Sequence, residues 1–175
     1  SKYESALKTL EAKGLVYACG CSRKAIEAAS GPVAPELRYP GTCREASVDG
    51  MVERARRVRM EREVVSFQDL RLGPVDQVPA DQAGDILVRD RHGHWTYQFA
   101  VVVDDFDQGI DLVIRGEDLL ASTGRQIQLA RLLGLVPVAF ALPGVGRQAD
   151  EAGHRRRHAV PRHGISKPPE GGEGA

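Results

Sequence analysis

The sequence predicts an α/β fold built as one domain, or as one domain with an insertion. Its 175 residues match one domain of ordinary size, and an apolar fraction of 42% is enough for a hydrophobic core. Segments with helical periodicity alternate with short apolar runs of strand type, and glycine and proline turns separate them.

The first third of the chain predicts two helices around a strand. Tyr3, Leu7 and Leu10 fall on one helical face, and Gly14 is placed to end that helix. Ser22 is placed to cap the second helix. The elements that follow the first helix are, in order, a strand at 15–20, a helix at 23–30, a loop rich in proline and glycine at 31–43, and a charged, partly helical segment at 51–63.

The rest of the chain predicts several strands and one further helix. Thr123 and Gln126 have the Thr-x-x-Gln spacing of a capping box, and they open a helix that Gly134 ends. Asp104 and Asp105 close a buried apolar run, which favours a solvated turn over a metal or acid–base site. The expected strands are 63–70, 84–90, 94–99, 110–116 and 136–142, and the composition after Pro143 predicts a disordered tail at 143–175.

Charge and composition exclude several classes of protein. The 24 basic and 24 acidic residues give a net charge of zero, so nucleic-acid binding would need a local patch. No segment is long and apolar enough to span a membrane, and the first residues lack the apolar run of a signal peptide. Three cysteines argue against a secreted disulfide framework and favour a reducing, cytoplasmic setting. The absence of an initiator Met is consistent with a processed product or a fragment.

All the cysteines of the chain lie between residues 19 and 43. Cys19 and Cys21 are separated by one residue, and Cys43 follows a Tyr-Pro-Gly turn. Thiolates select zinc or iron–sulfur over magnesium or calcium, and zinc takes four ligands. The alternative is three unrelated thiols. The candidates for the fourth ligand are the phenolate of Tyr39 and the imidazoles of His92 and His94.

A cluster of arginines lies in the segment that is expected to be partly helical. On a helix these side chains would be spread around the axis instead of forming one stripe. Contact with RNA phosphates is one interpretation, but charge balance favours a solvated helix paired with the neighbouring glutamates. The arginines are residues 54, 56, 57, 59 and 62, and the glutamates are residues 53, 61 and 63.

Several motifs taken together resemble the glutamyl-queuosine tRNA(Asp) synthetases, which are short paralogues of glutamyl-tRNA synthetase. The motifs are YACGCSRKAI, YPGTCR, FQDLRLG and a long block that begins GDILVRD, and they run in order through residues 17–135, about two thirds of the chain. The part of that block from Tyr97 to Leu133 is specific to the glutamyl synthetase group. The C-x-C, Tyr and Cys set favours the queuosine-modifying branch.

The resemblance implies the second half of a class I, Rossmann-type catalytic domain with an inserted zinc-containing α+β subdomain. Such enzymes activate glutamate with ATP and Mg²⁺, and transfer it to the queuosine base of tRNA(Asp). The implied partners are therefore that tRNA, glutamate and ATP, with no membrane, and we expect a monomer. The implied divisions are a core helix at 1–14, the insertion at 15–90, the second half of the catalytic domain at 91–142 and an aberrant or disordered tail at 143–175.

The resemblance also implies roles for six residues. The family's structural zinc ligands match Cys19, Cys21, Tyr39 and Cys43, and its glutamate-binding residues match Tyr97 and Arg115. Arg115 ends a predicted strand, where a guanidinium can grip a carboxylate at the carboxyl edge of a sheet. The alternatives are a salt bridge from Arg115 to Glu117 or Asp118, and a core position for Tyr97.

The chain also departs from the family pattern. Neither ATP-binding signature is found: HGHW at 92–95 is not the first, and the sequence after Leu142 lacks the Lys-Leu-Ser-Lys-like second. Gly124 stands where the family usually has proline, which predicts a mild loss of rigidity. We therefore expect that this chain alone does not form glutamyl-adenylate. Two other functions remain open, a fragment of glutamyl-tRNA synthetase and a non-catalytic, zinc-dependent RNA-binding module.

Overall fold

The computed structural model describes residues 1–30, 37–45, 54–135 and 139–141. These residues all lie in one compact unit, Ser1–Gly144. The predicted tail at 143–175 and the first part of the predicted loop, 31–36, lie outside the described residues. Within the described part, no helix has both the length and the apolar character needed to cross a membrane.

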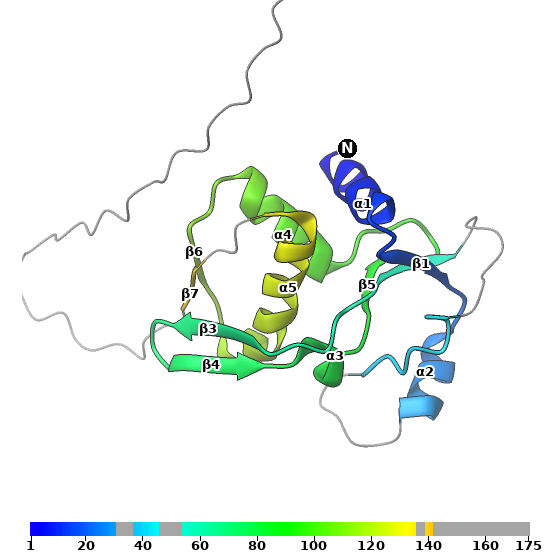
Figure 1. Cartoon of the computed structure of the whole chain (residues 1–175), viewed down its shortest axis with the longest axis horizontal. Coiled ribbons are helices and arrows are strands. Elements are labelled where there is room, and N and C mark those ends of the chain that lie inside the picture. The colour runs from blue at the N-terminus through cyan, green and yellow to red at the C-terminus, as the bar shows by residue number, and fades with distance from the viewer. Residues whose placement is uncertain (31–36, 46–53, 136–138, 142–175) are drawn as a thin grey trace, which may run out of the picture. The chain divides into compact units, whose positions relative to one another are not determined.

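Three antiparallel strands form the first sheet (Figure 1). They are β1 (Val16–Cys19), β2 (Ala55–Val58) and β5 (Ile86–Arg89), in the order β1-β2-β5. The register pairs Cys19 with Ala55 and Val16 with Val58. The first sheet therefore places the end of β1, where the cysteines begin, beside the start of β2.

The second sheet has four strands and is mixed. It consists of β3 (Val65–Asp69), β4 (Gly73–Gln77), β6 (Leu112–Ile114) and β7 (Ala139–Ala141), in the order β4-β3-β7-β6. β3 and β4 form an antiparallel hairpin, whereas β7 runs parallel to both β3 and β6. This sheet combines strands from both sides of the predicted subdomain boundary at residue 90, and that boundary stays a prediction.

Helices α4 (Tyr97–Asp107) and α5 (Thr123–Leu133) lie side by side between the two sheets (Figure 1). α4 packs on β5, and α5 packs on β3. Helix α1 (Lys2–Ala12) buries Leu7 and Leu10 against them, as its helical period predicts. The core buries apolar side chains from these helices and from β2 and β5. The remaining helices are α2 (Arg23–Ser30), the short α3 (Pro79–Gln82) and a 3₁₀ helix, η1 (Glu117–Ser122).

Asp104 and Asp105 lie in the last turn of α4, so the expected solvated turn is wrong. Asp104 accepts a hydrogen bond from the Tyr3 hydroxyl (2.8 Å) and forms a salt bridge with Lys2 (3.0 Å). These two contacts hold the pKa of Asp104 below its usual range. Burial raises the pKa of Asp105. The carboxylate of Asp104 therefore joins α1 to α4, which is a structural role.

The partly helical segment predicted at 51–63 is wrong where it is described, because residues 55–58 form strand β2. β2 is the central strand of the first sheet, and Val58 is fully buried in the core. Arg57 is also buried, and its guanidinium stacks 3.7 Å from the centre of the Tyr39 ring. Sheet pairing and burial therefore outweigh the helical propensity of the arginines, which the sequence alone cannot weigh.

The strand predicted at 94–99 is also wrong. Thr96 is the N-cap of α4, and Trp95 makes only an isolated bridge to Arg89. Aromatic and β-branched residues favoured a strand by composition. However, the buried residues Phe99, Val102 and Val103 recur with helical spacing. The helical period was the better guide.

Candidate metal centre and substrate site

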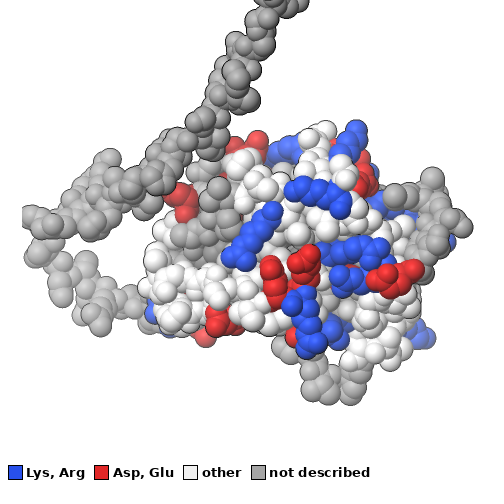
Figure 2. Space-filling view, viewed as in Figure 1, with Lys and Arg blue, Asp and Glu red and all other residues white. Residues whose placement is uncertain are grey.

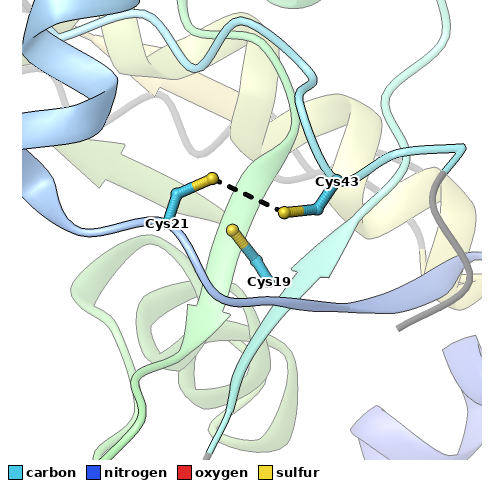
Figure 3. A group of neighbouring side chains, drawn as sticks. All are labelled: Cys19, Cys21 and Cys43. Carbon is cyan, nitrogen blue, oxygen red and sulfur yellow. Dashed lines mark hydrogen bonds between the residues drawn. The ribbon is translucent and has the colours of Figure 1, made fainter. Parts of the chain in front are cut away.

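The three cysteines converge on one point. Cys19 ends β1, Cys21 lies just before α2, and Cys43 lies in the turn at 41–45 (Figure 3). Their Sγ atoms lie within 4.8 Å of one another, and the Cys21 and Cys43 sulfurs are 3.5 Å apart. The alternative of three unrelated thiols is therefore excluded by the geometry.

Tyr39 lies at the same point. Its hydroxyl oxygen accepts a hydrogen bond from the Cys43 amide (2.9 Å) and one from the Cys19 thiol (3.4 Å), and it is 4.0 Å from the Cys21 sulfur. The side chain is almost fully buried. His92 and His94 are exposed, and His94 Nδ1 instead lies 3.0 Å from Asp90. Of the three candidates for a fourth ligand, Tyr39 is the one whose contacts reach the sulfurs.

These four side chains fit zinc. Zn–S bonds of about 2.3 Å place the sulfurs of a tetrahedral site about 3.8 Å apart, which lies inside the range that the three sulfurs span here. Three sulfur donors and one phenolic oxygen form a donor set that suits zinc better than magnesium or calcium, both of which prefer oxygen. Small adjustments of the side chains would suffice to close this cluster around a metal ion.

Two of these four side chains hold their protons tightly. Burial and the contact with Cys43 raise the pKa of Cys21 to about 11. Burial and the contact with Cys19 raise the pKa of Tyr39. Burial also acts to raise the pKa of Cys43, but the Gly20 amide and the Tyr39 contact outweigh it and leave that pKa lowered. A bound cation would have to displace protons from this cluster, as metals do at thiol sites.

Asp85 anchors the loop of Cys43 to the first sheet. Its buried carboxylate accepts hydrogen bonds from the Tyr17 hydroxyl (2.7 Å) and the Met60 amide (2.8 Å), and forms a salt bridge with Arg44 (3.2 Å). Arg44 follows Cys43 directly in the sequence. A single carboxylate therefore links the turn of Cys43 to β1 and to the end of β2.

A glycine fixes the position of Tyr39 from the other side. Gly84 has a φ of +69°, and a Cβ there would collide with the backbone carbonyl of Tyr39. The Tyr39 amide also donates a hydrogen bond to the Ala83 carbonyl (2.9 Å). The backbones of these two segments are therefore in close contact, which only glycine permits.

We predict that Gly84→Ala lowers the free energy of unfolding by about 3 kcal/mol, from left-handed backbone strain and overpacking together. The same change should weaken metal binding, because Tyr39 must move. Gly109→Ala is the matched control: Gly109 has a φ of +66°, and nothing lies within 4 Å of its Cβ position. It should cost only about 1 kcal/mol. Urea unfolding of both variants measures the difference, and equal losses would contradict the prediction.

Arg115 and Tyr97 form the second predicted site. Arg115 directly follows β6, and its guanidinium donates hydrogen bonds to Gln126 (2.7 Å) and to Thr123. Burial lowers the pKa of Arg115, and nearby Tyr97, Asp69 and Asp105 oppose that shift. Tyr97 begins α4 and is 57% exposed, so it is not a core aromatic. A half-buried guanidinium near an accessible phenol is suited to an anionic ligand.

The predicted capping box is wrong. Ser122 is the N-cap of α5 and makes no capping hydrogen bond with its side chain, whereas Thr123 and Gln126 both bind Arg115. Gln126 also donates to Gln98 (2.8 Å), which in turn donates to Ser122 (3.0 Å). The sequence did not predict that Thr123, Gln126, Gln98 and Ser122 support Arg115. For Gln98 the one signal in the sequence is its position next to Tyr97.

Gly124, which stands where the family usually has proline, has a packing role that the sequence did not predict. Its amide donates to the Gln77 side chain (2.8 Å), and a Cβ would lie 2.9 Å from Gln77 Cβ. Gln77 in turn donates to the Leu120 carbonyl (3.0 Å). The glycine therefore allows the end of β4 to approach the start of α5.

A family model for the catalytic domain of class I tRNA synthetases, of the glutamate and glutamine group, matches residues 1–150. The chain belongs to this family. This membership fits the site geometry, with a basic side chain at the carboxyl end of a strand in a mixed α/β unit.

Curated relatives give a finer comparison. The chain is 49% identical over 140 residues to a glutamyl-Q tRNA(Asp) synthetase of Bordetella bronchiseptica, with 77% of this chain and 44% of that protein covered. Proteins of the same name from Janthinobacterium sp. and Dechloromonas aromatica are 45% and 44% identical, over 75% and 85% of this chain and 47% and 50% of theirs. The chain thus spans about half the length of the curated relatives it matches.

Solved structures agree on the fold. A glutamate tRNA ligase from Elizabethkingia meningosepticum, in complex with its amino acid, superposes with a TM-score of 0.67. The match covers 85% of this chain and 34% of the ligase, at 20% identity. A glutamate-tRNA synthetase from Elizabethkingia anophelis gives 0.66, with 85% and 35% covered and 20% identity. At this identity the likeness supports a class I synthetase fold and no more.

Proposed function

We propose that this chain forms the second part of the catalytic unit of a glutamyl-Q tRNA(Asp) synthetase. Such an enzyme activates glutamate with ATP and Mg²⁺, and transfers the glutamyl group to queuosine in tRNA(Asp). The observation that carries the proposal is the convergence of Cys19, Cys21, Cys43 and Tyr39, a set that favours the queuosine-modifying branch. The names of the curated relatives support it.

In this proposal the zinc site is structural. Cys19, Cys21, Tyr39 and Cys43 would hold one ion, which supplies the cross-link that fixes the turn at 41–45 against β1 and α2. The cysteines and Tyr39 share a small core with Tyr17 and Ile26, far smaller than the main core. A core of that size gives little stabilisation by itself, and a structural zinc adds on the order of 10 kcal/mol in small modules.

Arg115 and Tyr97 would bind glutamate. The Arg115 guanidinium can pair with a carboxylate in bidentate geometry, and Gln126 and Thr123 hold it in place for that contact. The Tyr97 hydroxyl can donate to the same ligand. Transfer of a glutamyl group from an adenylate to a hydroxyl is acyl transfer, which depends mainly on positioning and on stabilising developing charge. These residues would supply the positioning.

A chimera tests this proposal. The 140 matched residues of the Bordetella relative would be replaced by those of this chain, and incorporation of labelled glutamate would be measured. We expect transfer to tRNA(Asp) that carries queuosine and no transfer to the same tRNA without it.

The product distinguishes the alternatives. Glutamate joined to the 3′ end of tRNA without queuosine would favour a glutamyl-tRNA synthetase. A folded, zinc-loaded chimera that transfers no glutamate to either tRNA would contradict the proposal and favour the non-catalytic RNA-binding module. The unmodified Bordetella protein is the positive control.

A further inference from the structure

The guanidinium of Arg115 belongs to a ring of hydrogen bonds that closes through the backbone. Many Lys and Arg side chains of this chain lie on the surface, several of them beside Asp or Glu (Figure 2). Arg115 is instead half-buried, and it donates to Gln126 (2.7 Å) and to Thr123. Gln126 donates to Gln98 (2.8 Å), and Gln98 donates to Ser122 (3.0 Å). The two branches that leave the guanidinium therefore end at adjacent residues.

The chemistry of arginine fixes the direction of every bond in this ring. A guanidinium has donors only, so Gln126 must present its Oε1 to Arg115. The Nε2 of Gln126 then needs an acceptor, which is Oε1 of Gln98. The Nε2 of Gln98 needs one in turn, which is Oγ of Ser122. Both amides thus turn their oxygens toward the cation along the ring, an alignment that favours the charged guanidinium.

The ring is largely closed to water. Ser122, Thr123 and Gln126 are 1%, 0% and 5% exposed, and Gln98 is half-buried. A buried polar group that loses its partner cannot turn to water instead, so a broken bond here costs more than one at the surface. Hydrogen bonds in such a network also strengthen one another. A change at one member of the ring should therefore reach the guanidinium.

Gln98 connects the ring to the second residue of the proposed glutamate site. It directly follows Tyr97 in the first turn of α4. Its partners lie elsewhere: Ser122 is the last residue of η1, and Gln126 lies in the first turn of α5. The loop after β6 supplies Arg115. One amide thus joins the helix that carries the phenol to the support of the guanidinium.

We propose that Gln98 is a positioning residue of the glutamate site, which acts on Arg115 through Gln126. The inference rests on the proposed function for the identity of the ligand. Gln98 holds the amide of Gln126 in the orientation that offers an acceptor to the guanidinium, so the fork is aimed before glutamate arrives. A guanidinium that is fixed in advance loses less conformational freedom when it binds a carboxylate. The alternative is that Gln98 only fastens α4 to α5.

Gln98→Met in the Bordetella chimera separates these two roles. Methionine keeps the unbranched shape of glutamine but cannot donate a hydrogen bond or replace the amide oxygen. We expect the KM for glutamate to rise roughly threefold to tenfold, the effect of losing one buried hydrogen bond. The kcat and the KM for ATP should change by less than about twofold, because only the binding of glutamate is affected. Gln98→Met should add nothing to the effect of Arg115→Ala, since both act on the same contact.

Gln108→Met is the matched control. Gln108 is an exposed glutamine at the C-cap of the same helix, so it undergoes the same chemical change away from the ring. It should leave kcat and both KM values unchanged. The proposal is overturned if Gln98→Met keeps a normal KM for glutamate, if the KM for ATP rises as much, or if the effects of Gln98→Met and Arg115→Ala multiply.

A second measurement needs neither a ligand nor activity. In the 175-residue chain, the NMR signals of the Gln126 side-chain amide and of the Arg115 guanidinium should both shift in Gln98→Met and stay in place in Gln108→Met. An Arg115 signal that is unchanged in Gln98→Met overturns the proposal, even if the chimera transfers glutamate. A chimera that transfers no glutamate contradicts the proposed function, and the NMR result still decides whether Gln98 positions the guanidinium.

Discussion

Replacing Cys43 by Ser should reduce the zinc content of the purified chain from about one ion per molecule to a small fraction of that. Cys43 supplies one of three sulfurs that lie within 4.8 Å of one another, and serine is a much weaker zinc ligand. We expect zinc affinity to fall on the order of 100-fold or more, because loss of a ligand exceeds the effect of losing a residue that only supports one. Zinc content by mass spectrometry and competition with a chromophoric chelator measure both effects.

The thermal stability of the same variant should follow its zinc content. A zinc chelator should lower the Tm of the unchanged chain and have little further effect on Cys43→Ser. Thr42→Ala is the matched control, since Thr42 is the exposed neighbour of Cys43 and should keep its zinc. Full zinc occupancy in Cys43→Ser, or an unchanged Tm after chelation, would contradict a structural metal at this cluster.

Replacing Arg115 by Ala should raise the KM for glutamate of the chimera described above on the order of 100-fold, measured by glutamate-dependent pyrophosphate exchange. A charge-assisted pair between a guanidinium and a carboxylate contributes about 1.5–3 kcal/mol, and its loss in a partly buried site costs the upper part of that range. The KM for ATP should change little, because the proposal gives Arg115 a contact with glutamate only. Arg115→Lys should recover part of the loss, since lysine keeps the charge but not the fork.

Arg131→Ala separates this effect from a general loss of charge. Arg131 lies on the exposed side of α5, and its guanidinium is 4.0 Å from Glu63. It should leave both KM values unchanged, because surface pairs contribute little. The glutamate site at Arg115 would be contradicted by a normal glutamate KM in Arg115→Ala, or by an equal rise for ATP.

Local signals in the sequence predicted much of the fold. Ser22 caps α2 because its hydroxyl oxygen accepts a hydrogen bond from the Ala25 amide (3.1 Å), and Gly134 ends α5 with a φ of +78°. The helical period of α1 and the apolar runs of β1, β3, β5 and β6 correspond to the observed elements. At these positions the conformation that the residue type favours locally is the same one that the tertiary fold requires.

The errors have a different origin. β2 is a strand because it pairs with β1 on one side and with β5 on the other. Arg57 can be buried because its guanidinium stacks on the Tyr39 ring and donates a hydrogen bond to the Asp85 carbonyl. None of those partners is near in sequence. Thr123 and Gln126 likewise accept hydrogen bonds from Arg115 instead of capping α5. Long-range partners decide such positions, and a local pattern cannot contain them.

The candidate site was partly accessible from the sequence. The spacing of the cysteines pointed to a metal, and the family resemblance favoured Tyr39 over the histidines as fourth ligand; the structure places Tyr39 at the sulfurs. Its role as a ligand stays a prediction.

X-ray absorption at the zinc edge of the zinc-loaded chain tests the central claim most directly. We predict three sulfur neighbours at about 2.3 Å and one oxygen or nitrogen neighbour at about 2.0 Å. In Tyr39→Phe the light-atom shell should change, whereas in His92→Ala it should stay as it is. Fewer than three sulfur neighbours, or a spectrum that responds to His92 and not to Tyr39, would contradict the site described above.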